Sequence, residues 1–268
     1  MNPARLILAV RRPEAGETAA ESIAMSPGIN RRPEVWKLDM ADLASIANAG
    51  INPWEFKLTE TDGLEQCVQV NAIATILLCA MLIPLLNHTA DLPSLSAKFP
   101  FQPHLTIVSS GAHLSLGELE GLEDGTIFHR ANLKENYANA ASGNGTYAKS
   151  KTISLMAMPE MVARTSPLVL VNAVDPGLIH SDTLRDFQGL AGLMTRLLYK
   201  VYARPVEEGG KAIAWPAIAS LDKSGMYCTE MAHRPSELVR SDTTGQKSAA
   251  IWKELASIWR DKAGVDLR

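Results

Sequence analysis

The sequence predicts an α/β fold in which helices cover a mostly parallel sheet. Three observations lead to it: short apolar runs rich in branched residues, helix-forming segments between them, and polar or glycine residues where the runs end. Strands that alternate with helices indicate parallel pairing, because each helix returns the chain to the same end of the sheet. The expected strands are residues 4–10, 34–39, 104–111, 168–174 and 225–229.

The composition fits one domain and excludes several classes of function. The 268 residues are 46% hydrophobic and 21% charged, without internal repeat or linker, so we expect a single domain over 1–268. A net charge of −3 gives no general attraction to nucleic acid. Cys67, Cys79 and Cys228 lack metal-ligand spacing, so neither a zinc site nor a disulfide framework is expected. A reducing, cytoplasmic location follows as the default.

The first 50 residues contain two of the strands and a helix between them. The run 4–10 leads into an alanine-rich segment over 14–25, which favours a helix, and the run 34–39 ends at Asp39. A few residues later, Asn48-Ala49-Gly50 forms a small-residue turn where backbone could approach a ligand closely.

The most apolar segment covers residues 70–86, and its length raises the question of a membrane span. It is slightly short, lacks flanking positive charge and carries Pro84 near its end. We therefore favour a buried or subunit-interface helix and expect no membrane span. The segment 59–62 offers N-cap residues for this helix.

Polar residues close two strands in the second half of the chain. Ser109 and Ser110 end the run 104–111, and Asp175-Pro176-Gly177 follows the run 168–174. Ligands of open α/β sheets bind at the carboxyl ends of the strands, so the serines border a candidate site.

The remaining segments are read as loop and helix. The polar stretch 115–145 is expected to be a loop or lid, and helices are expected over 147–164 and 241–262. The segment 183–220 contains two further helical stretches with an apolar face, and we predict that it is a substrate lid.

The helix over 147–164 carries Tyr147 and Lys151, four residues apart and therefore on one face. A lysine ammonium beside a phenol favours the phenolate and lowers the pKa of the tyrosine. Such a phenol donates and accepts protons near neutral pH. The spacing alone is common by chance, so its meaning depends on its surroundings.

Five features occur in one order along the chain: Asn48-Ala49-Gly50, Asn71, Ser109-Ser110, Tyr147-x-x-x-Lys151 and Pro176-Gly177. Together they resemble the short-chain dehydrogenase/reductase family, in particular its retinol-dehydrogenase-like and fungal secondary-metabolism branches. The resemblance covers nearly the whole chain. It implies a doubly wound, Rossmann-like domain, an NADP cofactor with NAD as the alternative, and a small apolar carbonyl or alcohol as substrate. It also implies a homodimer that pairs through the helices containing Asn71 and Tyr147.

The resemblance gives each catalytic candidate a role. Tyr147 transfers the proton to or from the substrate oxygen, and Ser110 hydrogen-bonds that oxygen. Lys151 lowers the pKa of Tyr147 and holds the nicotinamide ribose, and Asn71 supports Lys151 through water. Two simpler readings stay open: Ser110 could only cap its strand, and Asn71 could only bond nearby backbone.

The resemblance also assigns residues to the cofactor. Asp39 matches the acid that contacts adenine, Asn48 lies against the adenosine ribose, and Ile179 and Ser181 belong to the segment that grips the carboxamide. Arg11 matches a position where a basic residue meets an NADP 2′-phosphate. Asp39 as a loop N-cap and Arg11 as an ordinary surface arginine remain the alternatives. His113 and His180 are interpreted as wall or loop residues without a metal role.

Two parts of the family pattern are missing. No segment corresponds to the glycine-rich Thr-Gly-x-x-x-Gly-x-Gly turn that receives the pyrophosphate. Between Asp39 and Asn48 only residues 40–47 stand where the family has a helix and its fourth strand. We therefore expect an N-terminally truncated and internally deleted relative, whose incomplete doubly wound sheet lacks the first strand and most of the fourth.

Two classes of function follow. The first is an NAD(P)-dependent oxidoreductase that interconverts a carbonyl and an alcohol. The second is a degenerate, inactive relative, or an incorrectly delimited gene product, that acts only through protein contacts. A serine hydrolase is excluded because the sequence has no Gly-x-Ser-x-Gly elbow.

Overall fold

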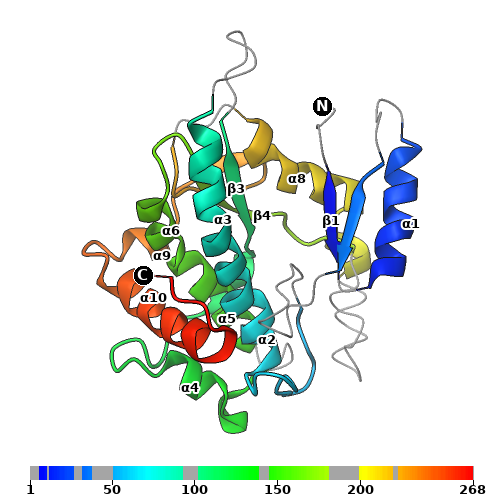
Figure 1. Cartoon of the computed structure of the whole chain (residues 1–268). Helices are drawn as coiled ribbons and strands as arrows, with labels where there is room; N and C mark the ends of the chain where they lie inside the picture. Colours follow the sequence, from blue (N-terminus) through cyan, green and yellow to red (C-terminus); the bar gives the residue numbers. More distant parts are fainter. Residues whose placement is uncertain are drawn as a thin grey trace.

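The computed structural model describes residues 6–10, 12–26, 32–37, 51–92, 102–138, 145–180, 199–219 and 223–267. Their strands form two sheets, as Figure 1 shows. One sheet pairs β1 (Ile7–Val10) with β2 (Glu34–Lys37) in parallel. The other has the order β3-β4-β5-β6, in which only the last pair is antiparallel. The predicted α/β fold with a mostly parallel sheet is confirmed.

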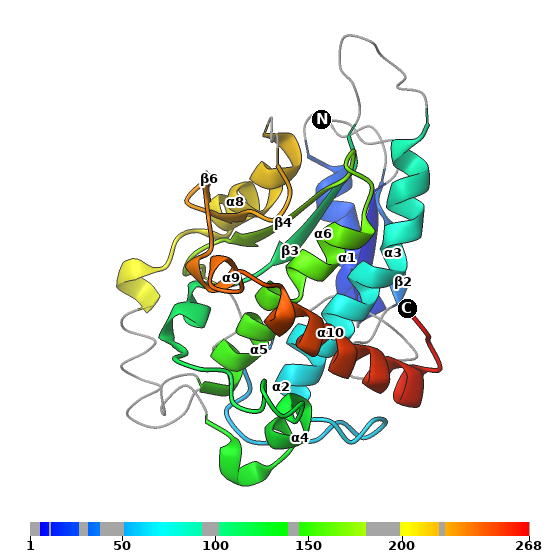
Figure 2. The ribbon, with the colours of Figure 1, turned by 90° about the vertical axis from the view of Figure 1, so that its left-hand side faces the viewer.

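The four-stranded sheet lies between two layers of helices. Its strands are β3 (His104–Val108), β4 (Leu170–Asp175), β5 (Tyr227–Thr229) and β6 (Ala232–Arg234). Helix α8 (Val206–Ile218) packs against β3 and β4 on one side. The other side carries α3 (Thr75–Ala90), α5 (Gly145–Met156), α6 (Met158–Arg164) and α10 (Gln246–Ile258), which Figure 2 shows across the sheet from α8.

The two-stranded sheet is covered by α1 (Pro13–Ala24). Gly16 of this helix lies so close to the strands that a Cβ atom would come within 2.6 Å of Val10 Cγ2 and 2.7 Å of Val35 Cγ1. The contact therefore depends on a residue without a side chain. Among the described strands, none pairs β1 or β2 with β3, as expected if the central strands of the family sheet are missing. Residues 38–50, which include Asp39 and Asn48, lie outside the described residues.

A continuous helical rod occupies the centre of the molecule. It consists of α2 (Gln66–Val68), the π-helical turn η1 (Gln69–Ala74) and α3. By length and composition it is the one helix of the described chain that could cross a membrane, yet 67% of its most apolar window is buried inside the protein. This burial is typical of a core helix, the reading favoured from the sequence.

The predicted start of this rod was wrong. The helix begins at Gln66 and is capped by Glu65, whose carboxylate accepts hydrogen bonds from Cys67 N (3.0 Å) and Val68 N (2.7 Å). Of the expected capping segment, Thr59 and Asp62 both hydrogen-bond the Gln69 side chain instead. Residues 59–64 form a turn that is closed by the hydrogen bond from Thr59 N to Leu64 O (2.8 Å). The helix therefore begins several residues later than predicted.

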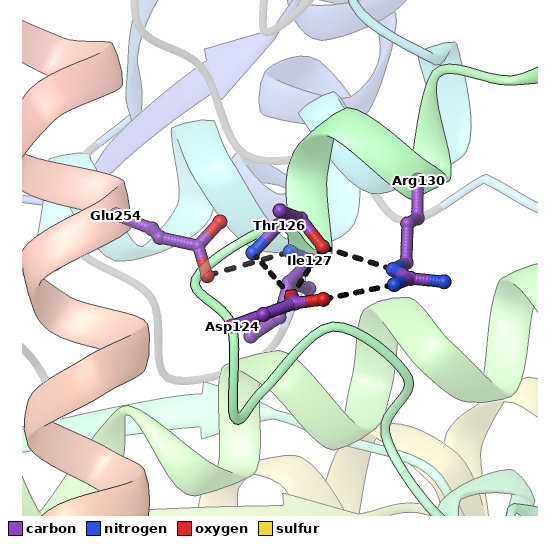
Figure 3. A network of polar contacts seen from close by, with 5 residues as sticks. All are labelled: Asp124, Thr126, Ile127, Arg130 and Glu254. Atoms are coloured by element: carbon purple, nitrogen blue, oxygen red, sulfur yellow. Dashed lines mark hydrogen bonds and ion pairs between the residues drawn. The ribbon is translucent and has the colours of Figure 1, made fainter.

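The described part of the stretch 115–145, residues 115–138, is more than a loop or lid. It contains α4 (Ile127–Ala131), with Ile127 and Phe128 buried in the core. Glu254 of α10 accepts hydrogen bonds from the amides of Ile127 and Phe128, both at 3.4 Å. Figure 3 shows Glu254 beside Ile127 at the start of α4. This carboxylate caps the short helix from outside the segment, so local sequence could not reveal it.

The C-terminal region closes the core. Helix α10 starts at Gln246, later than the expected 241. The strand expected at 225–229 is present as β5, whereas its antiparallel partner β6 and helix α9 (Glu237–Arg240) were not predicted. It continues into the π-helical turn η6 (Trp259–Ala263). The indole of Trp259 is fully buried and donates to Ile73 O at 3.1 Å. This hydrogen bond links the C-terminal helical segment to the central rod.

Glu65 gives the fold a pH dependence near neutrality. Its carboxyl is fully buried, and burial raises its pKa to about 7 although two amides bond it. The folded state binds this proton more tightly than the unfolded chain, so its stabilisation is present at low pH and is lost as pH rises. We expect Glu65→Gln to gain about 2–3 kcal/mol in unfolding free energy relative to the wild type between about pH 5 and about pH 8, measured by urea unfolding. Glu118→Gln, at an exposed position, is the control, and parallel pH profiles for Glu65→Gln and the wild type would contradict this expectation.

Candidate active site

Helix α5 brings Tyr147 and Lys151 to the carboxyl end of β3. Lys151 is 5% exposed, and its Nζ donates to Val108 O at 3.0 Å. The ammonium lies 5.7 Å from the centroid of the Tyr147 ring. Because Ser109 N donates to Val174 O on β4, the Val108 carbonyl faces the free edge of β3. Lys151 therefore satisfies a carbonyl that has no strand neighbour among the described residues.

Ser110 follows β3 directly and contacts Tyr147. Its side chain forms a hydrogen bond with the Tyr147 phenol. The same hydroxyl accepts from Ala112 N (3.2 Å) and caps the short 3-10 helix η2 (Gly111–Ser115). Ser110 thus caps the turn after its strand and lies at the candidate proton donor, while its hydrogen bond to the substrate oxygen stays a prediction.

Burial controls the charges of the pair. The pKa of Tyr147 is raised to about 12 because the phenol is buried, and the Ser110 hydrogen bond offsets only part of this. Burial lowers the pKa of Lys151 to about 8. The net pKa of Tyr147 is therefore raised, and the expected lowering by Lys151 stays a prediction. Near neutral pH the phenol keeps its proton and Lys151 is mostly charged.

Asn71 joins the central rod to two other segments. Its side chain is 2% exposed, and it donates to Ile51 O and accepts from Ile51 N, both at 2.8 Å. Its Nδ2 also donates to Ser150 Oγ at 3.0 Å. The simpler reading of Asn71, a helix residue bonded to backbone, is thus realised, while its water link to Lys151 stays a prediction.

Two serines of α5 complete this junction, and the sequence reading missed both. Ser150 Oγ donates to Tyr147 O (2.7 Å), and Ser154 Oγ donates to Asn71 O (2.8 Å). Both serines are buried. The available signal was the spacing of two small hydroxyl residues, four apart, on the same helix as Tyr147.

The cofactor candidates are only partly described. Ile179 forms an isolated parallel bridge with Arg204, and it packs against Gly209 of α8, where an added Cβ would lie 2.1 Å from Ile179 Cδ1. The predicted residues Arg11, Asp39, Asn48 and Ser181 lie outside the described residues.

The described residues fit one end of a nicotinamide dinucleotide. Tyr147, Lys151 and Ile179 follow or flank the strand ends, where the nicotinamide and its ribose would bind. The helix after β1 offers no phosphate cradle, because Pro13 has no N–H and Glu14 adds negative charge to its first turn. The described residues therefore supply no site for the pyrophosphate.

A parallel α/β sheet whose strand ends meet a Tyr-x-x-x-Lys helix defines an oxidoreductase of the Rossmann-like type. No family model matches the chain. The short chain dehydrogenase sol3 of Alternaria solani is 30% identical over 244 residues, covering 85% of this chain and 80% of that protein. The short-chain dehydrogenase/reductase phmF of Phaeosphaeria nodorum is 28% identical over 282 residues, covering 97% and 80%.

Two solved structures share the fold. One is an alcohol dehydrogenase from the archaeon Thermococcus sibiricus, with a TM-score of 0.54, 14% identity and coverage of 87% and 88% of the two chains. The other is a 3-alpha-hydroxysteroid dehydrogenase from Pseudomonas sp. B-0831, with a TM-score of 0.53, 18% identity and coverage of 84% and 94%. The chain belongs to the short-chain dehydrogenase/reductase family, a family of oxidoreductase enzymes.

Because the Asn71 side chain bonds the Ile51 backbone, its removal should weaken the protection of the Ile51 amide against hydrogen exchange. Asn71→Ala removes both hydrogen bonds to Ile51, so we expect the Ile51 amide to exchange with solvent at least about tenfold faster and unfolding to cost about 2 kcal/mol less. Hydrogen exchange and denaturant unfolding measure the two effects. Asn87→Ala is a matched control, because Asn87 also bonds two backbone groups, Arg164 O and Ser166 N. An unchanged Ile51 amide in Asn71→Ala would contradict this role.

Proposed function

We propose that this enzyme reduces the carbonyl group of a small apolar molecule, using a nicotinamide dinucleotide. The observation that carries the proposal is the contact of Ser110 with a buried, protonated Tyr147 phenol beside the Lys151 ammonium. A phenol that holds its proton near neutral pH is prepared to donate it, which favours reduction over alcohol oxidation.

The three side chains divide the work. Ser110 orients the substrate oxygen, and the Tyr147 hydroxyl donates a proton to it. The positive charge of Lys151 stabilises the phenolate that remains. The bound cofactor supplies the hydride to the carbonyl carbon, so that hydride and proton together convert the carbonyl to an alcohol.

NADP is the proposed cofactor, with NAD as the alternative. The archaeal alcohol dehydrogenase is complexed with 5-hydroxy-NADP and the steroid dehydrogenase with NADH, so structures of this fold hold either type. We assign Arg11 to the 2′-phosphate, Asp39 and Asn48 to the adenosine, and Ile179 and Ser181 to the carboxamide. This assignment rests on the family resemblance of those positions.

The setting of the reaction is part of the proposal. We treat 1–268 as one domain with 183–220 as its lid, and the resemblance to the fungal secondary-metabolism branch of the family favours a role in secondary metabolism. The free thiols of Cys67, Cys79 and Cys228 agree with a cytoplasmic protein. A homodimer would pair through the exposed Met81 and Leu85 of α3 rather than through α5, because α10 and its neighbours bury almost all of α5.

One observation favours a second candidate function. The sequence has no glycine-rich turn for the pyrophosphate, and the described residues offer no replacement. A relative that cannot hold the cofactor would act only through protein contacts. Fluorescence titration decides between the two: an active reductase binds NADPH or NADH below about 1 mM, and no binding at that concentration would sink the reductase proposal.

Tyr147→Phe tests the chemistry. The variant lacks the donated proton, so we expect kcat for a carbonyl substrate to fall at least about 100-fold while cofactor affinity stays within about threefold. Tyr137→Phe is the matched control, because its hydroxyl bonds Pro53 O away from the site and its loss should leave kcat nearly unchanged. Full turnover by Tyr147→Phe would exclude the assigned role.

A further inference from the structure

A carboxylate outside the predicted catalytic group lies at the end of β4. Asp175 is the last residue of that strand, and its Oδ1 accepts from Gly177 N at 2.9 Å. Its Oδ2 accepts from the Tyr227 hydroxyl of β5 at 3.0 Å. Tyr227 is 6% exposed, so this bond is largely shielded from water. Two donors therefore fix the carboxylate in one orientation.

The same carboxylate touches the segment that carries Ser110. A Cβ atom on Gly111 would lie 3.1 Å from Asp175 Oδ2, which places the carboxylate against the backbone next to Ser110. Any larger residue at Gly111 would displace either the carboxylate or this turn.

Tyr227 also contacts the turn after β3 through its ring. Its ring packs edge to face on His113, with 5.0 Å between the centroids. The buried His113 ring bonds Ser110 O through Nδ1 at 2.7 Å. The ends of β3, β4 and β5 are thus joined through one chain of contacts that leads to Ser110.

Asp175 also acts on the charges of the candidate pair. Its negative charge raises the pKa of Lys151 and the pKa of Tyr147, on both of which burial has the larger effect. The other titratable groups that act on one or both residues of the pair are the buried Cys67 thiol and Tyr199. Since burial raises the pKa of Cys67, its thiol stays neutral, which leaves Asp175 as the fixed charge among these groups.

We propose that Asp175 and Tyr227 are a positioning pair for carbonyl reduction. Tyr227 and Gly177 hold the Asp175 carboxylate against the turn next to Ser110, and from there its negative charge acts on Lys151 and Tyr147. The pair also fixes the turn that presents Ser110. This role rests on the proposed reductase function, whereas the effect of the charge is measurable without any cofactor.

The test is the titration of Lys151 in the full chain. The 13Cε shift of labelled lysine is followed by NMR, and the Lys151 signal is assigned with Lys151→Arg. Asp175→Asn removes the charge, so we expect Lys151 to bind its proton at least about threefold more weakly than in the wild type. Asp91→Asn, an exposed change of the same net charge, should leave the Lys151 midpoint where it is.

Tyr227→Phe separates charge from packing. It removes the hydroxyl that positions the Asp175 carboxylate but keeps the charge, so the Lys151 midpoint should fall by less than in Asp175→Asn. An unchanged midpoint in Asp175→Asn, or an equal fall in Tyr227→Phe, would overturn the proposal. Asp175→Ser replaces Asp175→Asn if that variant does not fold. Because the titration needs no turnover, an inactive protein whose Lys151 midpoint still shifts would refute the reductase function but not the charge effect.

Discussion

A buried amide holds together the three segments on which the candidate site depends. Asn71 lies in the π-helical turn of the central rod, bonds both backbone groups of Ile51 and donates to Ser150 of the helix that carries Tyr147. Ser154 of α5 also donates a hydrogen bond to Asn71 O, which gives a second link between α5 and the rod. A buried amide left without partners costs about 1–3 kcal/mol, so the junction is stable only while all three segments keep their places. π-helical turns recur at functional sites, and here the turn carries the side chain that bonds both Ile51 and Ser150.

Burial is the largest influence on the pKa values of Tyr147 and Lys151. It holds the proton on Tyr147 and weakens the proton on Lys151, the reverse of what a solvated lysine–tyrosine pair would do. The ammonium is compensated by the Val108 carbonyl at the free edge of β3 and by the nearby Asp175. The residues proposed for proton transfer are therefore all described, whereas the sequence has no turn for the cofactor phosphates.

Local patterns sufficed for much of this protein. The runs around Ile107 and Val171 predicted buried strands, and the Tyr147–Lys151 spacing predicted the helix face that meets Ser110. The errors arose where a distant partner decides the outcome. Glu254 caps α4 from more than 100 residues away in sequence, and Trp259 reaches back to Ile73 with a separation of 186. Tyr227 and Asp175 form another such pair. Their hydrogen bond exists only because β4 and β5 lie side by side, so local sequence could not predict it.

The coupling between Asn71 and Ser150 measures this junction directly, because that contact joins the rod to the helix that carries Tyr147. It is measured as the interaction free energy in a double-mutant cycle of Asn71→Ala and Ser150→Ala, by urea unfolding. The account predicts a favourable coupling of about 1 kcal/mol or more. Additive effects, with a coupling below about 0.3 kcal/mol, would show that the two segments are held independently and would contradict it.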